Sequence, residues 1–451
     1  MTSLWFESAL LPQGWASRVR LTCEAGRIGQ VAAGVDPAEA DERHAVGFPG
    51  LPNLHSHAFQ RALAGLTERA GPGGDSFWTW RELMYQFVER IDPDELEAIA
   101  CLAYAQMLES GFTQVGEFHY LHHDRGGVPF ADPGELACRI AAAAARTGIG
   151  LTLLPTLYAH GGFGGSAPSA RQRRFIMDRD RFADTLESSR RAVKALPGGV
   201  VGVAAHSLRA VTPEELAWLV GTAGDVVIHI HIAEQVREVE DCVAWSGRRP
   251  VEWLLEHAAV DGRWCLVHAT HVTQAEIEGV AARGAVVGLC PITEANLGDG
   301  IFPARNFLDH AGRIGIGSDS NVLLDAAEEL RTLEYSQRLA QRARNVLASK
   351  PGVSTARSLF DATLSGGAQV LRSPGGFIPG ASLDAVSLRS ADEALTQRRE
   401  DELLDSWVFS GGRGLIDCVW RAGEKVVSDG RHRDRAPIVE RYRRVLKRAL
   451  S

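Results

Sequence analysis

Eight short apolar segments alternate with long stretches of helical composition through most of this 451-residue chain. Such near-continuous apolar segments are typical of parallel strands that helices cover on both faces. Eight repeats of the unit favour a closed (β/α)8 TIM-type barrel, with an open doubly wound sheet as the alternative. The apolar segments are residues 48–53, 113–118, 150–157, 200–205, 226–232, 265–269, 286–290 and 313–317, and the amphipathic segments between them are 93–110, 133–147, 179–196, 213–223, 235–259, 273–283 and 325–348.

Both ends of the chain have shorter, strand-like segments. These are residues 4–6, 19–23 and 27–31 before the barrel, and 380–388, 407–409, 414–421 and 425–428 after it, with a charged helix around 391–405. We therefore predict a small β-sandwich domain built from both chain ends (1–48 plus 375–430), a barrel over 49–374 and a C-terminal helix within 431–451.

The composition restricts the class of protein. Apolar residues make up 45% of the chain and charged residues 23%, which is typical of a folded globular protein. The 48 basic and 56 acidic residues give a net charge of −8, so a basic nucleic-acid-binding surface is not expected. No apolar run is long enough to span a membrane, and the N-terminus does not resemble a signal peptide. Seven scattered cysteines without a CxxC motif indicate reduced thiols. We expect a soluble cytoplasmic protein.

Polar residues follow nearly every apolar segment. In a (β/α)8 barrel the carboxyl ends of the strands build the active site, so these side chains are expected to meet at one face. They are His55, His57, Glu117, Tyr120, Tyr158, His206, His231, His268 and Asp319.

Some of these residues form a candidate metal site. His55 and His57 are two positions apart on an extended segment, so both imidazoles point the same way. Together with His231 and Asp319 they would suit Zn²⁺ or another borderline divalent ion. His229, two positions before His231, is interpreted as a packed residue of the barrel interior.

Two further polar residues, Glu234 and His268, lie at strand ends of the same barrel face. Glu234 lies three positions after His231 and could carry a proton between a metal-bound water and a substrate nitrogen. Alternatively, Glu234 is a carboxylate at a helix N-terminus that only interacts with the helix dipole. His268 could orient or deprotonate that water, or could be a buried residue of its strand.

The motifs resemble a known family. PNLHSH at 52–57, HIAE at 231–234, VHAT at 267–270 and IGSDS at 316–320 resemble the amidohydrolase superfamily. NLHSHAFQR at 53–61, SFWTWREL at 76–83, EFHYLHH at 117–123 and HSLR at 206–209 resemble formimidoylglutamate deiminases more narrowly. This resemblance implies hydrolysis of N-formimino-L-glutamate to N-formyl-L-glutamate and ammonia, in histidine degradation, by a zinc-activated water.

The resemblance also implies residue roles. One Zn²⁺ would be held by His55, His57, His231 and Asp319, with Glu234, His268 and Asp319 transferring protons. Around the substrate it implies Gln60, Arg81, Tyr120, His206 and Arg209. None of the four lysines ends a strand, so a lysine that bridges two metal ions is not expected. Glu117 lies near the end of the second strand and could still act as a bridging carboxylate. Fe²⁺ and Mn²⁺ would also fit these ligands.

The implied substrate carries two carboxylates. Arg81 and Arg209 could bind them, because a guanidinium recognises a carboxylate in a planar, bidentate way. Trp78 and Trp80 are expected in a loop near the site, and the glycine-rich segment 161–165 in a mobile lid. A homodimer is expected, with the small β domain and the C-terminal helix as candidate contact surfaces.

Two other functions stay open at this point. The first is a superfamily deaminase acting on a nucleobase or another aromatic ring, which would share the metal ligands. The second is a catalytically silent barrel used for assembly, which would not need the complete set of polar residues.

Overall fold

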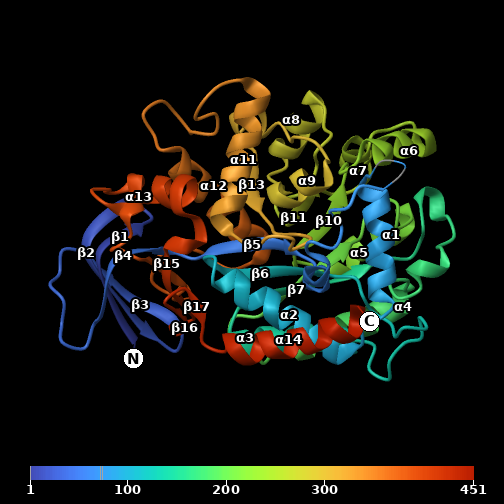
Figure 1. Cartoon of the computed structure of the whole chain (residues 1–451). Helices are drawn as coiled ribbons and strands as arrows, with labels where there is room; N and C mark the ends of the chain where they lie inside the picture. Colours follow the sequence, from blue (N-terminus) through green and yellow to red (C-terminus); the bar gives the residue numbers. More distant parts are fainter. Residues whose placement is uncertain (1, 72, 74, 451) are drawn as a thin grey trace.

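The protein is a parallel β/α barrel with a second sheet beside it (Figure 1). The structure is a computed structural model, and it describes residues 2–71, 73 and 75–450. Eight barrel positions pair in parallel in the order of the sequence, which confirms the predicted closed barrel over the open sheet. The barrel strands are β5 (Leu51–Ser56), β6 (Phe112–His119), β7 (Gly150–Leu157), β8 (Val200–Val201) with β9 (Val203–Ala205), β10 (Ile228–Ile232), β11 (Trp264–His268), β12 (Val286–Leu289) and β13 (Arg313–Ile316).

The barrel closes between its first strand and the segment that follows its last. The backbone N–H of Ser318 donates to the carbonyl of His55 at 3.0 Å, and His57 N–H donates to Asp319 at 2.9 Å. Gly317 permits this approach, because a Cβ there would lie 2.8 Å from atoms of His55. Closure therefore brings the first and last strand ends, with their histidines and aspartate, into direct contact.

Helices cover the outside of the barrel. Several begin with the expected capping chemistry; at α2, for example, Asp92 accepts from Glu95 N–H and Glu95 accepts from Asp92 N–H. The helices are α1 (Phe77–Val88), α2 (Pro93–Leu108), α3 (Glu135–Thr147), α4 (Arg179–Val193), α5 (Pro213–Ala223), α6 (Val236–Ser246), α7 (Pro250–His257), α8 (Gln274–Ala282), α9 (Pro291–Leu297), α10 (Ala304–Asp309), α11 (Ala326–Gln341) and α12 (Thr355–Leu371).

Two expectations in this region are wrong. The segment 235–259 is two helices, because Gly247 takes a left-handed conformation (φ 73°) that ends α6 and Pro250 begins α7. Trp78 and Trp80 lie on helix α1, whose N-terminus is capped by Ser76, rather than in a loop.

The second sheet has eight strands and combines both chain ends. Its order is β17 (Arg431–His432), β16 (Glu424–Ser428), β15 (Ile416–Arg421), β14 (Ala385–Leu388), β4 (Glu42–Pro49), β1 (Thr2–Leu11), β2 (Gly14–Glu24) and β3 (Arg27–Ala32). A backbone bridge joins Arg27 to Ser382, so the sheet curls. Buried side chains from both halves, such as Leu21 and Trp420, share one core.

Two strand expectations need correction. Residues 48–53 were expected to be one barrel strand, but Phe48 belongs to β4 of the second sheet and the barrel strand starts at Leu51. Residues 407–409 form a helical turn after α13 (Asp401–Ser406), not a strand. A short apolar run does not distinguish a buried strand from a buried helical turn.

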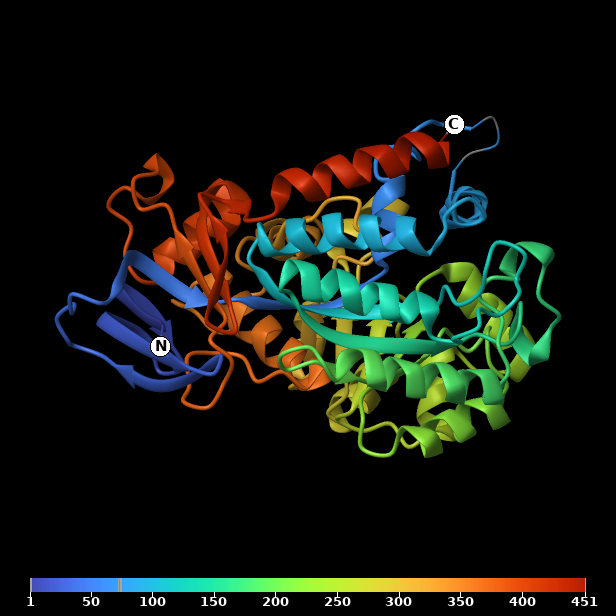
Figure 2. The same cartoon turned by 90° about the horizontal axis from the view of Figure 1, so that it is seen from below.

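The C-terminal helix α14 (Arg435–Leu450) packs along the barrel helix α2 (Figure 2). Arg441 pairs with Glu97 at 2.6 Å, and Arg435 pairs with Glu109 at 3.2 Å. All seven cysteines have free thiols, and six of them are buried. Within the described residues, no helix combines the length and apolar character needed to cross a bilayer.

Candidate active site

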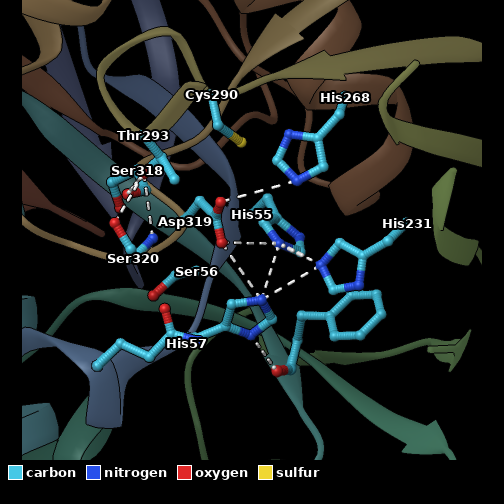
Figure 3. A network of polar contacts seen from close by, with 12 residues as sticks. His55, Ser56, His57, His231, His268, Cys290, Thr293, Ser318, Asp319 and Ser320 are labelled. Carbon is cyan, nitrogen blue, oxygen red and sulfur yellow. Dashed lines mark hydrogen bonds and ion pairs between the residues drawn. The ribbon is translucent and has the colours of Figure 1, made fainter. Parts of the chain in front are cut away.

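Five of the expected polar residues meet at the carboxyl ends of the barrel strands (Figure 3). His55 lies near the end of β5 and His57 follows it, His231 lies on β10, His268 ends β11, and Asp319 follows β13. His268 and Asp319 have left-handed backbones, with φ of 69° and 44°. Such conformations are strained for residues other than glycine and occur where a chain must turn abruptly to aim a side chain.

Three imidazole nitrogens converge on one point. The Nε2 atoms of His55, His57 and His231 lie 3.0 to 3.3 Å from one another. Asp319 Oδ1 lies 3.3 Å from Nε2 of His57 and 3.5 Å from Nε2 of His55. A tetrahedral ion with bonds of about 2.0 Å would separate its ligands by about 3.3 Å, which matches this spacing.

Hydrogen bonds from the Nδ1 atoms determine whether the Nε2 atoms carry a proton or a lone pair. Nδ1–H of His57 donates to the carbonyl of Phe118 at 2.9 Å, and Nδ1–H of His231 donates to that of His206 at 3.0 Å. The Nε2 atoms of these two neutral rings therefore carry lone pairs. Lone pairs that face one another at 3.3 Å repel unless a cation lies between them. The donor set thus fits a divalent metal ion.

Burial favours the uncharged rings that a metal needs. It lowers the pKa of His55 to about 3 and lowers the pKa values of His57 and His231 as well. Burial opposes ionisation of Asp319, but hydrogen bonding to His55 and the nearby imidazole charges outweigh it and hold the pKa of Asp319 below its ordinary value. The site therefore offers three neutral imidazoles and one carboxylate at neutral pH.

A buried amide network holds the first and last strand ends together. Asn321 donates from Nδ2 to the carbonyl of His57 at 2.9 Å and to that of Asp319 at 3.1 Å. Its Oδ1 accepts from Ser318 Oγ at 2.6 Å, and Asn53 Nδ2 donates to the same Oγ at 2.7 Å. Asn321 therefore sets the backbone positions of two candidate ligands without touching the ion.

Replacing Asn321 with Ala is expected to weaken metal affinity roughly 10- to 100-fold, as the loss of a ligand-orienting hydrogen bond commonly does. Competition with a chromogenic chelator measures this affinity. Asn306→Ala is the matched control, because Asn306 lies on α10 and bonds Gln274 away from the site. Equal affinities in the two variants would contradict the positioning role of Asn321.

Glu234 and His268 lie side by side next to the candidate ligands. His268 Nε2 is 3.8 Å from Glu234 Oε1 and 3.7 Å from Asp319 Oδ2. Burial raises the pKa of Glu234 to about 7. Burial opposes the charged form of His268, but Glu234, Glu294 and Asp319 raise its pKa to about 10. Glu234 can therefore exchange a proton near neutral pH, whereas His268 keeps its own.

The five expected substrate residues line one pocket above the histidines. Gln60 Nε2 donates to the hydroxyl of Tyr120 at 2.9 Å. The ring of His206 packs 5.3 Å from that of Tyr120. Arg81, on α1, stacks over Trp78 at 4.6 Å, and Arg209 lies 3.9 Å from the buried carboxylate of Glu238.

Sequence reasoning missed residues that support this site. Glu294 on α9 accepts from His268 Nδ1 at 3.2 Å. Glu238 faces Arg209 and also accepts the backbone N–H of Glu234 at 3.1 Å. Tyr158, noted only as a strand-end residue, lies in the pocket wall with its ring 4.3 Å from that of His206. A glutamate just after the seventh strand end was the available signal for Glu294.

His229 and Glu117, which the sequence also offers near the metal site, lie outside the group of converging residues. His229 Nε2 donates to the carbonyl of Val370 at 3.0 Å, deep in the barrel interior. Glu117 Oε1 accepts from Ala58 N–H at 2.7 Å, and burial raises the pKa of this carboxyl to about 8. The converging residues are therefore His55, His57, His231 and Asp319.

Comparison with known proteins places this fold and site in a family. Residues 46–426 match the amidohydrolase family, and residues 1–45 match the N-terminal domain of formimidoylglutamate deiminase HutF. A formimidoylglutamate deiminase of Pseudomonas aeruginosa is 51% identical over 435 residues, 96% of each chain.

Solved structures agree. An amidohydrolase from Brucella melitensis has a TM-score of 0.97 and 52% identity over the whole of both chains. An adenosine deaminase from Xanthomonas campestris, solved with bound zinc, has a TM-score of 0.83 and 22% identity, covering 100% of this chain and 98% of its own, and shares the fold.

The barrel, with its converging histidines and aspartate, is that of a metal-dependent amidohydrolase. Within that class, the chain belongs to the formimidoylglutamate deiminase family.

Proposed function

We propose that this chain hydrolyses N-formimino-L-glutamate to N-formyl-L-glutamate and ammonia, a step of histidine degradation. The observation that carries the proposal is the pocket itself, where Arg81 and Arg209 lie above the converging histidines and Glu234. The two arginines suit the carboxylates of a dicarboxylate substrate, and the histidines with Glu234 suit a hydrolysable C=N bond in the same molecule. The relative from Pseudomonas aeruginosa, named a formimidoylglutamate deiminase, supports the same substrate.

The guanidinium groups account for the choice of substrate. Arg81 Nε and Arg209 Nε are buried and make no hydrogen bond within the described residues. Each therefore has a donor available for a carboxylate, and a charge-assisted bond of this kind is among the stronger ones in proteins. Gln60, Tyr120 and His206 line the same pocket as the two arginines, and we assign them to holding the formimino group and the carbon chain of the substrate.

The chemistry consumes one water, and both protons of that water end on the departing nitrogen. A divalent ion held by His55, His57, His231 and Asp319 would lower the pKa of a bound water. Oxygen then adds to the formimino carbon, the bond from that carbon to the imino nitrogen breaks, and ammonia leaves. Glu234 takes one proton from the water and delivers it to the imino nitrogen, and the second proton passes from the added hydroxyl to the same nitrogen through Glu234 as the carbon–nitrogen bond breaks.

His268 and Asp319 assist Glu234 from neighbouring positions. His268 is held by Glu294 through Nδ1, so Nε2 points towards both Asp319 and Glu234. We assign His268 to orienting the water and compensating its developing negative charge, since its pKa of about 10 keeps it protonated. Asp319, ionised at neutral pH, accepts a hydrogen bond from the water.

We assign one Zn²⁺ per chain to the site. Three imidazoles and one carboxylate at tetrahedral spacing suit zinc, although Fe²⁺ and Mn²⁺ use the same ligand types. Glu117, the candidate bridge to a second ion, turns towards the backbone of Ala58 instead. Metal analysis of protein purified without added ions tests both identity and number, with one zinc per chain expected.

Arg209→Lys is expected to raise KM for N-formimino-L-glutamate roughly 10- to 100-fold, because lysine keeps the charge opposite Glu238 but loses the planar fork. The value of kcat should change far less. Steady-state assays of ammonia release measure both constants. Arg191→Lys, on the exposed side of α4, is the matched control and should behave as wild type. An unchanged KM in Arg209→Lys would remove Arg209 from substrate binding.

The function itself is tested by ammonia release from N-formimino-L-glutamate, with the organic product identified by mass. We expect N-formyl-L-glutamate at a turnover on the order of 1 s⁻¹ or faster. A zinc-loaded, folded protein that releases no ammonia from this compound but deaminates a nucleobase would overturn the proposal.

We further propose a cytoplasmic homodimer. The seven free thiols are compatible with a reducing compartment. The second sheet and helix α14 lie on the outside of the barrel and offer candidate contact surfaces. Light scattering after size-exclusion chromatography tests the dimer, and a monomer mass at micromolar concentration would contradict it.

A further inference from the structure

We propose that Arg237 is a third guanidinium of the substrate site, which attracts the dicarboxylate at the pocket mouth and helps to hold it. The inference rests on the proposed dicarboxylate substrate and assigns a specificity role to a residue outside the motifs of the family resemblance. Arg237 lies in the first turn of α6, three positions after Glu234.

Three arginines share one tryptophan. The guanidinium carbons of Arg81, Arg237 and Arg209 lie 4.6, 5.0 and 5.8 Å from the ring centroid of Trp78. Two of these arginines line the pocket above the candidate ligands. Trp78 thus serves as a platform that places Arg237 beside the two substrate arginines.

Helix stability does not explain why a cation occupies this position. A positive charge in the first turn of a helix opposes the helix dipole, which favours anions there. The ion pair with Asp241, four residues further along, spans 3.7 Å, and both side chains are more than half exposed. Pairs of this kind contribute little. Contact with Trp78 is the stronger of its interactions, and it holds the charge of Arg237 against the same ring as Arg81 and Arg209.

Three guanidinium groups around one ring repel one another, and a bound anion would reduce this repulsion. From the ring distances, no two of the guanidinium carbons can be more than about 11 Å apart, which is comparable with the screening length in physiological salt. Glu238 faces Arg209, yet the buried Nε atoms of Arg81 and Arg209 have no acceptor among the described residues. A substrate with two carboxylates would offset this repulsion.

The charge of the whole protein makes such a cluster useful. With a net charge of −8, the protein repels a dianion at long range, so local positive charge must guide the substrate inwards. Arg237 is the most exposed of the three, with 65% of its side chain accessible, so its charge is available to a substrate that approaches from solvent. Its contribution should appear in KM and in the salt dependence of kcat/KM.

The test compares Arg237→Gln with wild type in the metal-loaded enzyme. We expect KM for N-formimino-L-glutamate to rise about 5- to 10-fold with kcat within twofold, and kcat/KM to fall less steeply with added NaCl. Arg237→Lys should keep most of the salt dependence, because it keeps the charge.

A matched control separates this effect from a general loss of positive charge. Arg179 begins helix α4 and also stacks on a tryptophan, with its guanidinium carbon 5.8 Å from the ring of Trp218, but that ring is not the one on which Arg81 and Arg209 stack. Arg179→Gln should behave as wild type. The inference is overturned if Arg237→Gln has a wild-type KM, or if Arg179→Gln raises KM equally. An inactive wild type would instead overturn the proposed function.

Discussion

Replacing Glu234 with Gln is expected to lower kcat about 1,000-fold, or about 4 kcal/mol in activation free energy, while the protein keeps its metal. Glu234 is 5% exposed, and it is not one of the four converging ligands. Gln has the same shape but cannot accept a proton from the water. The substitution therefore removes proton transfer and leaves the ligands in place.

Three readouts make this result specific to proton transfer. Ammonia release gives kcat, metal analysis gives ion content, and the melting temperature reports folding. Glu240→Gln is the matched control, because Glu240 is exposed on α6, the helix that follows Glu234. A kcat for Glu234→Gln within tenfold of wild type, with metal present, would remove Glu234 from the mechanism and favour a carboxylate that only interacts with the dipole of α6.

The site was predictable from the sequence because strand ends can be read from it. His55, His57, His231, His268 and Asp319 each end or follow an apolar segment, and barrel topology requires those ends to share one face. The structure brings all five side chains together at that face.

Residues that act through tertiary contacts were not predictable in the same way. Glu238 is one of many glutamates in helical segments, and nothing local shows that it faces Arg209. Arg237 looks like an ordinary exposed helix residue until Trp78, about 160 positions earlier, is placed beside it. Pairing across long sequence separations is decided by the fold, which a local pattern does not contain.

The boundary between β4 and β5 was also not predictable from a local sequence pattern. β4 and β5 are separated by Gly50 alone, and their apolar residues read as one segment. The two strands nevertheless pair in different sheets, β4 with β1 and β14, and β5 with β6. A Cβ at position 50 would lie 2.2 Å from Thr113 Cγ2, so only glycine lets the chain pass between the sheets here.

His231→Ala is expected to abolish stoichiometric metal binding and to reduce kcat roughly 10⁴-fold, since the ion supplies several kcal/mol of transition-state stabilisation. His231 contributes one of three Nε2 atoms that lie within 3.3 Å of one another, and the remaining ligands would leave an open coordination position. Metal content after desalting and ammonia release measure the two effects.

His229→Ala is the decisive comparison, because it removes the same side chain from the same strand. His229 is fully buried and donates to the carbonyl of Val370, so its loss leaves an unsatisfied acceptor and should destabilise the fold by about 1–3 kcal/mol. Its imidazole does not belong to the converging group, so the variant should keep one metal per chain and near-normal kcat below its melting temperature. If His229→Ala lost its metal while His231→Ala kept it, the assignment of ligands on β10 would have to be reversed. The alternation of side chains along a strand makes the two positions neighbours on one face, and only the depth of each in the barrel separates a metal ligand from a structural histidine.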